Sequence, residues 1–332
     1  MPDLGGSLKQ FFAKGRVRLR DVAVANGFFV TGDEWCISVA SLSSLDDIPA
    51  LMDASPTLTA ADVFGVSARF VADPFLFERH GTVYLFMEVM DAVSNKGLIG
   101  WAELDDNGWR FAGVALEQRF HLSYPQILES EGEVYMIPET SAERSVRLYR
   151  ASTFPSKWEY CSTLLEGEPY SDASLLKHDG LWWMLVESSS GPSFDTLRLF
   201  LSSHLEGPWS EHPCSPIVKG DAKAARPAGP PVWLDGRLIR LAQDCREVYG
   251  RAVFGFEVVR LSPALYEERG FGDAPLLCGR GSGWNGQAMH HVSVLPQGDH
   301  WLVAVDGRPM PGFRLPKLQH RGRSTGRGAS SN

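Results

Sequence analysis

Three stretches of this chain share one layout: DPFLFERHGTVYLFME (73–88), YPQILESEGEVYMIPE (124–139) and DASLLKHDGLWWMLVE (172–187). Each consists of two runs of aliphatic, β-branched and aromatic residues around a turn that contains glycine, which predicts a β-hairpin. In each stretch a polar residue opens the first run and a Glu closes the second run, 15 positions later. The shared interval predicts that the three hairpins repeat one structural unit.

Two looser copies of the hairpin follow: RPAGPPVWLDGRLIRLAQD (226–244) and HHVSVLPQGDHWLVAVD (290–306). The five copies open near residues 73, 124, 172, 226 and 290. A period near 50 residues is the size of a four-stranded propeller blade. We therefore predict an all-β fold, a five-bladed β-propeller.

The outer halves of the blades repeat as well. Residues 98–109, 146–158 and 197–209 each give a strand, a turn and a closing Trp that we expect to pack within the blade, and 252–268 is a looser copy. The fifth hairpin lacks such a partner, so we predict that an N-terminal strand, Trp35–Ala40, closes the ring and removes the free sheet edges. Residues 1–312 would then form a single propeller domain.

The remaining segments are short. We expect one or two short helices around Ser44–Leu51 and Thr59–Phe64. Residues 313–332 form a tail rich in Arg, Gly and Ser, which predicts a disordered, solvated end, with a docking segment for an anionic partner as the alternative. The tail's basic residues are Arg314, Lys317, Arg321, Arg323 and Arg327.

Composition narrows the class of protein. The chain has 332 residues, 32 of them Lys or Arg and 40 Asp or Glu, so its net charge of −8 argues against a general nucleic-acid binder. It has no run of about 18 apolar residues, so we expect no membrane-spanning helix. Five widely spaced cysteines and no apparent secretion signal predict reduced thiols and a cytoplasmic location.

Propeller geometry places the candidate site. The first strand of each blade lies nearest the axis, so the hairpin openers should converge at one end of the channel, with the closing residues beside them. The predicted ring contains Asp73, Tyr124, Asp172, Arg226 and His290 or His291, and behind it lie Glu88, Glu139, Glu187, Gln243, Asp244 and Asp306. Crowded carboxylates repel one another and lose solvation, which raises some of their pKa values and indicates a functional site.

A purely structural interpretation stays open for each residue. Asp73 and Asp172 are also typical turn residues, and Arg226 could only neutralise nearby carboxylates. The three closing glutamates could solvate strand ends, and the two histidines could be buried structural groups. Trp284, in a glycine-rich loop before the last opener, could instead stack on the ring of a ligand.

The motifs resemble the five-bladed propeller enzymes of glycoside hydrolase family 43. ADPF (72–75) resembles the segment that carries the family's general base, SDASLL (171–176) the segment with its third-blade Asp, and LEGPW (205–209) a turn common in these propellers. The resemblance implies that Asp73 acts as a base and that Asp172 orients the substrate and tunes the pKa of the acid. It also implies a calcium ion beside His290 or His291, although no Asp-rich calcium loop accompanies them.

A further set of motifs resembles the propeller region of plant glucosamine inositolphosphorylceramide transferases. The set comprises HLSYP (121–125), YMIPET (135–140), LYRASTFPSKW (148–158) and the stretch ARPAG…RLAQDCREVYG (225–250). Similar propellers occur in bacterial proteins, some joined to formyltransferase-like domains. This resemblance implies the same fold and a role in glycan or glycolipid metabolism.

One position departs from the hydrolase pattern. The hydrolases take their general acid, a Glu, from the fourth blade, where this chain has Arg226, and an arginine does not donate a proton near neutral pH. Glu187, with Glu139 in reserve, would then be the acid. Alternatively, the leaving group is a phosphate that needs no acid and is bound by Arg226.

We therefore predict a carbohydrate-active enzyme that cleaves or transfers a glycosyl unit at the mouth of the channel. The ligand would be a carbohydrate or a sugar phosphate. Asp73, Asp172, Glu187 and Glu139 are the candidate catalytic residues. The candidate substrate-binding residues are Glu88, Tyr124, Arg226, Gln243, Asp244, Trp284, His290 and His291. We expect no metal ligands and no cofactor, with calcium left open. The alternatives are a non-catalytic sugar-binding or scaffold propeller, and transfer from a phosphate-bearing donor.

Overall fold

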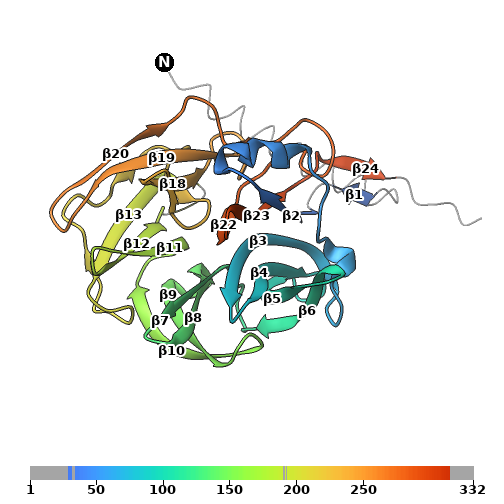
Figure 1. The fold of residues 1–332 in the computed structure, drawn as a ribbon, viewed down its shortest axis with the longest axis horizontal. Coiled ribbons are helices and arrows are strands. Elements are labelled where there is room, and N and C mark those ends of the chain that lie inside the picture. Colours follow the sequence, from blue (N-terminus) through green and yellow to red (C-terminus); the bar gives the residue numbers. More distant parts are fainter. Residues whose placement is uncertain (1–28, 32–33, 190, 192, 315–332) are drawn as a thin grey trace, which may run out of the picture. The chain divides into compact units, whose positions relative to one another are not determined.

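The computed structural model describes residues 29–31, 34–189, 191 and 193–314. Residues 33–310 form one compact unit, in which five antiparallel sheets surround a common axis (Figure 1). The prediction of an all-β, five-bladed propeller is confirmed. The first strands of neighbouring blades contact one another around the axis, so the polar residues that open them are brought together.

Blades 1 and 2 are regular four-stranded sheets. Blade 1 consists of β3 (Ala68–Arg79), β4 (Thr82–Asp91), β5 (Lys96–Asp105) and β6 (Gly108–Leu116). Blade 2 consists of β7 (Ser123–Ser130), β8 (Glu133–Thr140), β9 (Ser145–Thr153) and β10 (Lys157–Glu166). The hairpins quoted above form the inner half of each blade, as their repetition predicts.

Blades 3 and 4 are less regular. Blade 3 consists of β11 (Ser171–His178), β12 (Leu181–Glu187) and β13 (Thr196–Ser202), with short strands β14 (Ser210–Glu211) and β15 (Val218–Lys219) both paired to β13. Blade 4 consists of β16 (Arg226–Pro227), β17 (Val232–Leu234), β18 (Arg237–Gln243), β19 (Ala252–Leu261), β20 (Tyr266–Phe271) and β21 (Leu277–Cys278). Its inner strand is split into β16 and β17 because the intervening prolines cannot donate ladder hydrogen bonds.

The fifth blade joins the two ends of the propeller. It contains β22 (Val292–Gln297), β23 (His300–Gly307) and β2 (Cys36–Leu42), in the order β2-β23-β22. β2 pairs with β23 without a break, from Cys36 opposite Gly307 to Leu42 opposite Trp301. Closure of the ring by an N-terminal strand is therefore confirmed.

The first strands of blades 1, 2 and 3 share a β-bulge next to the axis. The pairing register slips around Asp73, Tyr124 and Asp172. These three residues have positive φ angles of 50°, 47° and 51°, respectively. A bulge bends its strand and re-aims a side chain. For a bulky residue such as Tyr124 this conformation is strained, so the surrounding contacts must hold it in place.

Blades 4 and 5 approach each other closely at Gly229. The N–H of Val292 donates to the carbonyl oxygen of Ala228 at 2.8 Å. Gly229 has a φ of +129°, and a Cβ atom there would lie 2.0 Å from the carbonyl oxygen of Val292. Only glycine fits this position.

Two short 3₁₀-helices, η1 (Leu45–Asp53) and η2 (Ala60–Asp62), occupy the regions in which short helices are expected. The buried face of η1 packs against core residues of blades 4 and 5. Among the described residues, no helix is both long and apolar enough to cross a bilayer.

A second unit contains β1 (Phe29–Thr31) paired with β24 (Gly312–Arg314). The first residues of the predicted tail therefore belong to a strand. Residues 315–332, with the tail's other basic residues, lie outside the described part of the chain.

Candidate functional site

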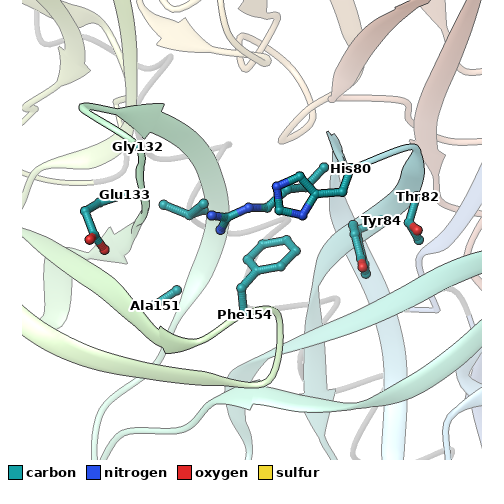
Figure 2. Close-up of a pocket in the computed structure, with 9 residues that line it drawn as sticks. His80, Thr82, Tyr84, Gly132, Glu133, Ala151 and Phe154 are labelled. Carbon is teal, nitrogen blue, oxygen red and sulfur yellow. The ribbon is translucent and has the colours of Figure 1, made fainter.

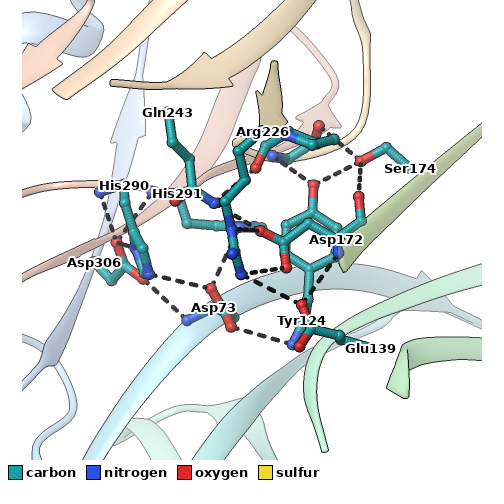
Figure 3. Close-up of polar contacts among 12 residues, drawn as sticks. Asp73, Tyr124, Glu139, Asp172, Ser174, Arg226, Gln243, His290, His291 and Asp306 are labelled. Carbon is teal, nitrogen blue, oxygen red and sulfur yellow. Dashed lines mark hydrogen bonds and ion pairs between the residues drawn. The ribbon is translucent and has the colours of Figure 1, made fainter. Parts of the chain in front are cut away.

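Six carboxylates gather around one arginine where the hairpins open and close. Asp73 and Glu88 come from blade 1, Glu139 from blade 2, Asp172 and Glu187 from blade 3, and Asp306 from blade 5. We call these six the carboxylate ring. Five of the six are buried, as is Arg226 of blade 4, and the side chain of the sixth, Glu139, is 9% exposed. Figure 3 shows Asp73, Glu139, Asp172 and Asp306 with Arg226 among them. The convergence expected from the repeats is thus present.

Arg226 is held on both sides. Its Nε donates to Asp172 Oδ2 at 2.7 Å, and its Nη2 donates to Glu139 Oε2 at 3.3 Å. The guanidinium lies 4.8 Å from the ring of Phe194 and 5.0 Å from that of Tyr249. Burial lowers the pKa of Arg226, but Asp172 and the other anionic neighbours outweigh it, so this arginine stays charged.

Glu139 accepts three hydrogen bonds. Besides Arg226, it accepts hydrogen bonds from Ser141 Oγ at 2.7 Å and from the N–H of Asp172 at 3.3 Å. Burial raises the pKa of Glu139, but Arg226 and these hydrogen bonds bring it below its usual value. This carboxylate is therefore ionised, which argues against the reserve role as acid that we expected for it.

Burial raises the pKa of Asp172, and Arg226 opposes that increase. Gln243 Nε2 also donates to Asp172 Oδ2, at 2.8 Å. Gln243 therefore lies in the site as predicted, as a partner of Asp172.

Glu187 accepts a hydrogen bond from the N–H of Ser189 at 2.7 Å, and burial raises the pKa of Glu187.

Asp73 has an intermediate proton affinity. Its Oδ2 accepts from the N–H of Tyr124 at 3.1 Å, and its own N–H donates to Asp306 Oδ2 at 3.0 Å. Burial raises the pKa of Asp73 to about 6, although His290 opposes the increase. Just above that pH, Asp73 is an ionised carboxylate with an appreciable affinity for a proton.

Asp306 and His290 form a tight pair. Asp306 Oδ1 lies 2.7 Å from His290 Nδ1 and accepts the backbone N–H groups of His290 and His291, each at 3.1 Å. The ring of His290 stacks on Trp35 with centroids 4.0 Å apart. Its Nε2 lies 3.6 Å from Asp73 Oδ1.

Asp73, His290 and Asp306 could each offer an atom to a cation, since their potential ligand atoms lie within 4.8 Å of one another. However, Asp306 Oδ1 already accepts three hydrogen bonds and Oδ2 accepts one. Two carboxylates and an imidazole also supply far fewer oxygen atoms than the six to eight that calcium takes. The residues present therefore do not fit the calcium ion that the hydrolase resemblance implies.

Tyr124 and His291 lie deeper than expected. Both are fully buried, at 0% exposure. The Tyr124 hydroxyl is 2.6 Å from Ser174 Oγ and accepts the N–H of Gly229 at 2.8 Å. Burial lowers the pKa of His291 to about 3, so its ring is neutral. These positions do not support the sugar contacts that we expected from the two side chains; they fill the channel beneath the carboxylate ring.

Asp244 and Trp284 also differ from expectation. Asp244 is paired through both oxygens with Arg246, at 2.9 Å each. Trp284 Nε1 donates to the carbonyl oxygen of Ala54 at 2.6 Å, and its indole lies against Gly307, where a Cβ atom would be 2.5 Å away. Trp284 therefore fastens its loop to the N-terminal segment instead of presenting a free face to a ligand.

The sequence interpretation missed three side chains near the site. Phe194 and Tyr249 enclose Arg226, and His121 Nε2 lies 3.5 Å from Glu88 Oε1. Tyr249 and His121 both belong to motifs quoted above. Each of the three lies outside the repeated hairpins, so the spacing of the repeats gave no signal for them.

A separate hollow of about 420 Å³ lies at the turn ends of the β3–β4 and β7–β8 hairpins (Figure 2). The ring of Phe154 stands there beside Tyr84, with centroids 4.9 Å apart, and 5.3 Å from the guanidinium of Arg79. Because the carboxylate ring sits at the opposite ends of these strands, the hollow does not belong to it.

Comparisons with known proteins agree with the motifs. A family model described as "Glucosamine inositolphosphorylceramide transferase 1, N-terminal" matches residues 41–308. The protein named glucosamine inositolphosphorylceramide transferase 1 in Oryza sativa subsp. japonica is 33% identical over 323 residues, covering 94% of this chain and 41% of the relative. The Arabidopsis thaliana protein of that name is 33% identical over 264 residues, covering 76% of this chain and 34% of the relative. The chain thus spans well under half the length of these relatives.

The chain is also similar in fold to solved structures that are named as glycoside hydrolases. The catalytic domain of a family 62 α-L-arabinofuranosidase from Coprinopsis cinerea aligns with a TM-score of 0.55 and 11% identity, over 73% of this chain and 91% of that one. An exo-β-1,3-galactanase from Clostridium thermocellum aligns with a TM-score of 0.51 and 11% identity, over 64% of this chain and 52% of that one. At such identities the similarity shows the fold alone.

Proposed function

This chain belongs to the family of glucosamine inositolphosphorylceramide transferase 1 N-terminal regions, and we propose that its propeller binds a glycosyl group at the carboxylate ring and cleaves or transfers it. The relatives are named for transfer of a sugar, and proteins with the same fold are named for sugar cleavage. Fold alone does not determine activity, so the proposal rests on the chemistry of the ring.

The observation that carries the proposal is the spread of proton affinities within one buried cluster. The pKa of Asp73 is raised to about 6, while Arg226 and hydrogen bonds hold that of Glu139 below its usual value. Neighbouring carboxyl groups whose pKa values are pushed apart can take different roles in acid–base catalysis. At neutral pH Asp73 would accept the proton of an attacking water or sugar hydroxyl.

The charges of the carboxylate ring and Arg226 indicate which kind of substrate can bind. Arg226 is already paired with Asp172 and Glu139, so its charge is compensated before any ligand arrives. The remaining carboxyl groups favour a neutral or cationic sugar over a phosphate-bearing donor. An amino sugar with a free ammonium group fits this balance, and the relatives' name contains glucosamine.

A thermal-shift screen tests the binding step, because a ligand that binds only the folded state raises the melting temperature. We would compare glucosamine, N-acetylglucosamine, glucose and glucose 1-phosphate. Glucosamine should stabilise the protein most. Stabilisation by the phosphate alone would contradict the proposal.

Turnover of oligosaccharides and glycosyl donors tests the chemical step. The Asp73→Asn variant should lose turnover and keep binding, whereas Asp105→Asn, a change at an exposed carboxylate on β5, should keep both.

Binding without catalysis is the second candidate. The observation that favours it is Arg226, which stands where the hydrolases carry their acid and occupies two of the ring's carboxylates. This candidate predicts saccharide-induced stabilisation without turnover from any donor, in wild-type protein and Asp73→Asn alike.

A further inference from the structure

Glu88 is the ring member in which one buried oxygen has no hydrogen-bond partner among the described residues. It lies near the end of β4 and is 6% exposed. Its Oε1 is buried and makes no hydrogen bond with any described residue. Burial and the charges of Asp73, Glu139, Asp172 and Asp306 raise the pKa of Glu88 well above its usual value. A carboxyl group in such surroundings binds its proton more tightly than an exposed glutamate does.

His121 faces this carboxyl group in a defined tautomer. Its Nδ1 accepts the backbone N–H of Gly97 at 2.9 Å. A ring nitrogen that accepts a hydrogen bond carries no proton, so the proton of the neutral ring is on Nε2. Nε2 lies 3.5 Å from Glu88 Oε1, so the protonated nitrogen of the ring is beside that oxygen.

His121 stays neutral in this position. Burial lowers the pKa of His121, and of the charged groups around it Glu139 opposes this effect while Arg226 adds to it. Its side chain is 37% exposed, so one edge of the ring reaches solvent.

The backbone around Gly97 builds the arrangement. The N–H of Leu122 donates to the carbonyl oxygen of Gly97 at 3.0 Å, which fixes the segment between blades 1 and 2 against β5. A Cβ atom at residue 97 would lie 2.8 Å from both Glu88 Oε1 and His121 Cε1. Glycine thus lets the imidazole and the carboxyl group approach the same backbone position.

We propose that Glu88 is the proton donor of this site and that His121 is the residue that positions it. The inference rests on the proposed glycosyl chemistry. The proposal assigns to Glu88 the role of general acid, which Arg226 cannot fill. Because the Nε2–H group of His121 lies beside Oε1, the donor atom that we propose is Oε2, from which a substrate oxygen would take the proton.

The proton balance of the step is complete. As the bond between the anomeric carbon and the leaving oxygen breaks, its electron pair passes to that oxygen, which takes the proton of Glu88. The attacking water or acceptor hydroxyl bonds to the anomeric carbon and gives its proton to Asp73. Asp73 gains one proton and Glu88 loses one, and proton exchange with solvent restores both groups.

NMR spectroscopy tests the arrangement without any substrate. In ¹⁵N-histidine-labelled full-length protein at pH 7, the His121 signals should show an unprotonated Nδ1 and a protonated Nε2. The His121→Gln variant assigns these signals by removing them. In ¹³C-glutamate-labelled protein, the carboxyl signal lost in Glu88→Gln should titrate well above the usual range of glutamate. A protonated Nδ1, or an ordinary titration of Glu88, overturns the proposal.

Kinetics test the roles once a substrate is found. Glu88→Gln should lower kcat/KM at neutral pH about 10²- to 10⁴-fold and remove the alkaline limb of the pH profile. His121→Leu should move that limb to higher pH, because a lost N–H donor no longer favours the carboxylate. His121→Gln, which keeps a donor, should restore it. The control Glu129→Gln, at an exposed position of β7, should match wild type.

The two proposals fail differently. If the NMR results are as expected and no donor is turned over, the proposed function fails and the Glu88–His121 arrangement stands. If turnover occurs and Glu88→Gln retains it, the assignment of the proton donor is wrong and the proposed function stands.

Discussion

Replacing Arg226 with methionine should destabilise the protein by about 3–5 kcal/mol at pH 7, the usual cost of removing one partner of a buried ion pair. The side chains of its partners Asp172 and Glu139 are 2% and 9% exposed, so water cannot replace the lost guanidinium. Methionine keeps most of the volume between Phe194 and Tyr249, so the loss reports charge rather than a cavity.

The loss should depend on pH with a definite sign. Arg226 holds the pKa of Glu139 below its unfolded value, so this carboxylate stabilises the fold above that value and less as the pH falls. In Arg226→Met this stabilisation is absent. The gap between wild type and variant should therefore be widest near neutral pH and narrow toward pH 4.

Urea denaturation followed by tryptophan fluorescence, repeated from pH 7 to pH 4, measures this gap. Arg110→Met is the matched control, since Arg110 is 56% exposed and pairs with Glu103 at the surface; it should cost under about 1 kcal/mol. A loss from Arg226→Met no larger than the control's, or one that is constant with pH, would refute the reasoning.

Three further predictions concern the interior. Between about pH 4 and pH 6, Asp73 alone should contribute a loss of about 3 kcal/mol of stability as the pH rises, since with its pKa raised to about 6 it keeps a proton that the unfolded chain releases; urea denaturation should show stability falling less, by about this amount, in Asp73→Asn than in wild type. Tyr124→Phe should cost about 1–3 kcal/mol in the same assay, because the buried N–H of Gly229 loses its acceptor. Gly229→Ala should abolish soluble expression, since the new Cβ would overlap the carbonyl oxygen of Val292; soluble protein with a wild-type melting temperature would contradict this.

The fold was predictable because it depends on local patterns that repeat. Alternating apolar residues and glycine turns specify each hairpin, and the missing outer strand of the fifth hairpin identified the N-terminal segment as its partner. The shared interval from opener to closing Glu has a structural cause. Each Glu pairs with the residue before the opener, and the opener occupies the bulge with its side chain re-aimed.

The sequence predicted which residues lie in the site better than it predicted what each of them does. Repetition placed Asp73, Asp172 and Arg226 together, but hydrogen bonds decide what each group can do. Tyr124 occupies the bulge of blade 2 that corresponds to those of the two aspartates, yet its ring is fully buried and packs against Phe75. His121 meets Glu88 through the backbone of Gly97, a contact between blade 1 and the following linker that no repeat encodes. The expected cytoplasmic location stays a prediction.

Closure of the fifth blade by β2 also governs when the chain can fold. Cys36 emerges from the ribosome early, whereas its partner Gly307 is among the last propeller residues to be synthesised. While the first four blades are synthesised, β2 therefore has no partner strand, and the edges of the nascent sheets are open to other chains. Contacts so distant in sequence are typical of slow folding. Production of this propeller should thus depend strongly on translation rate and on chaperones that shield sheet edges.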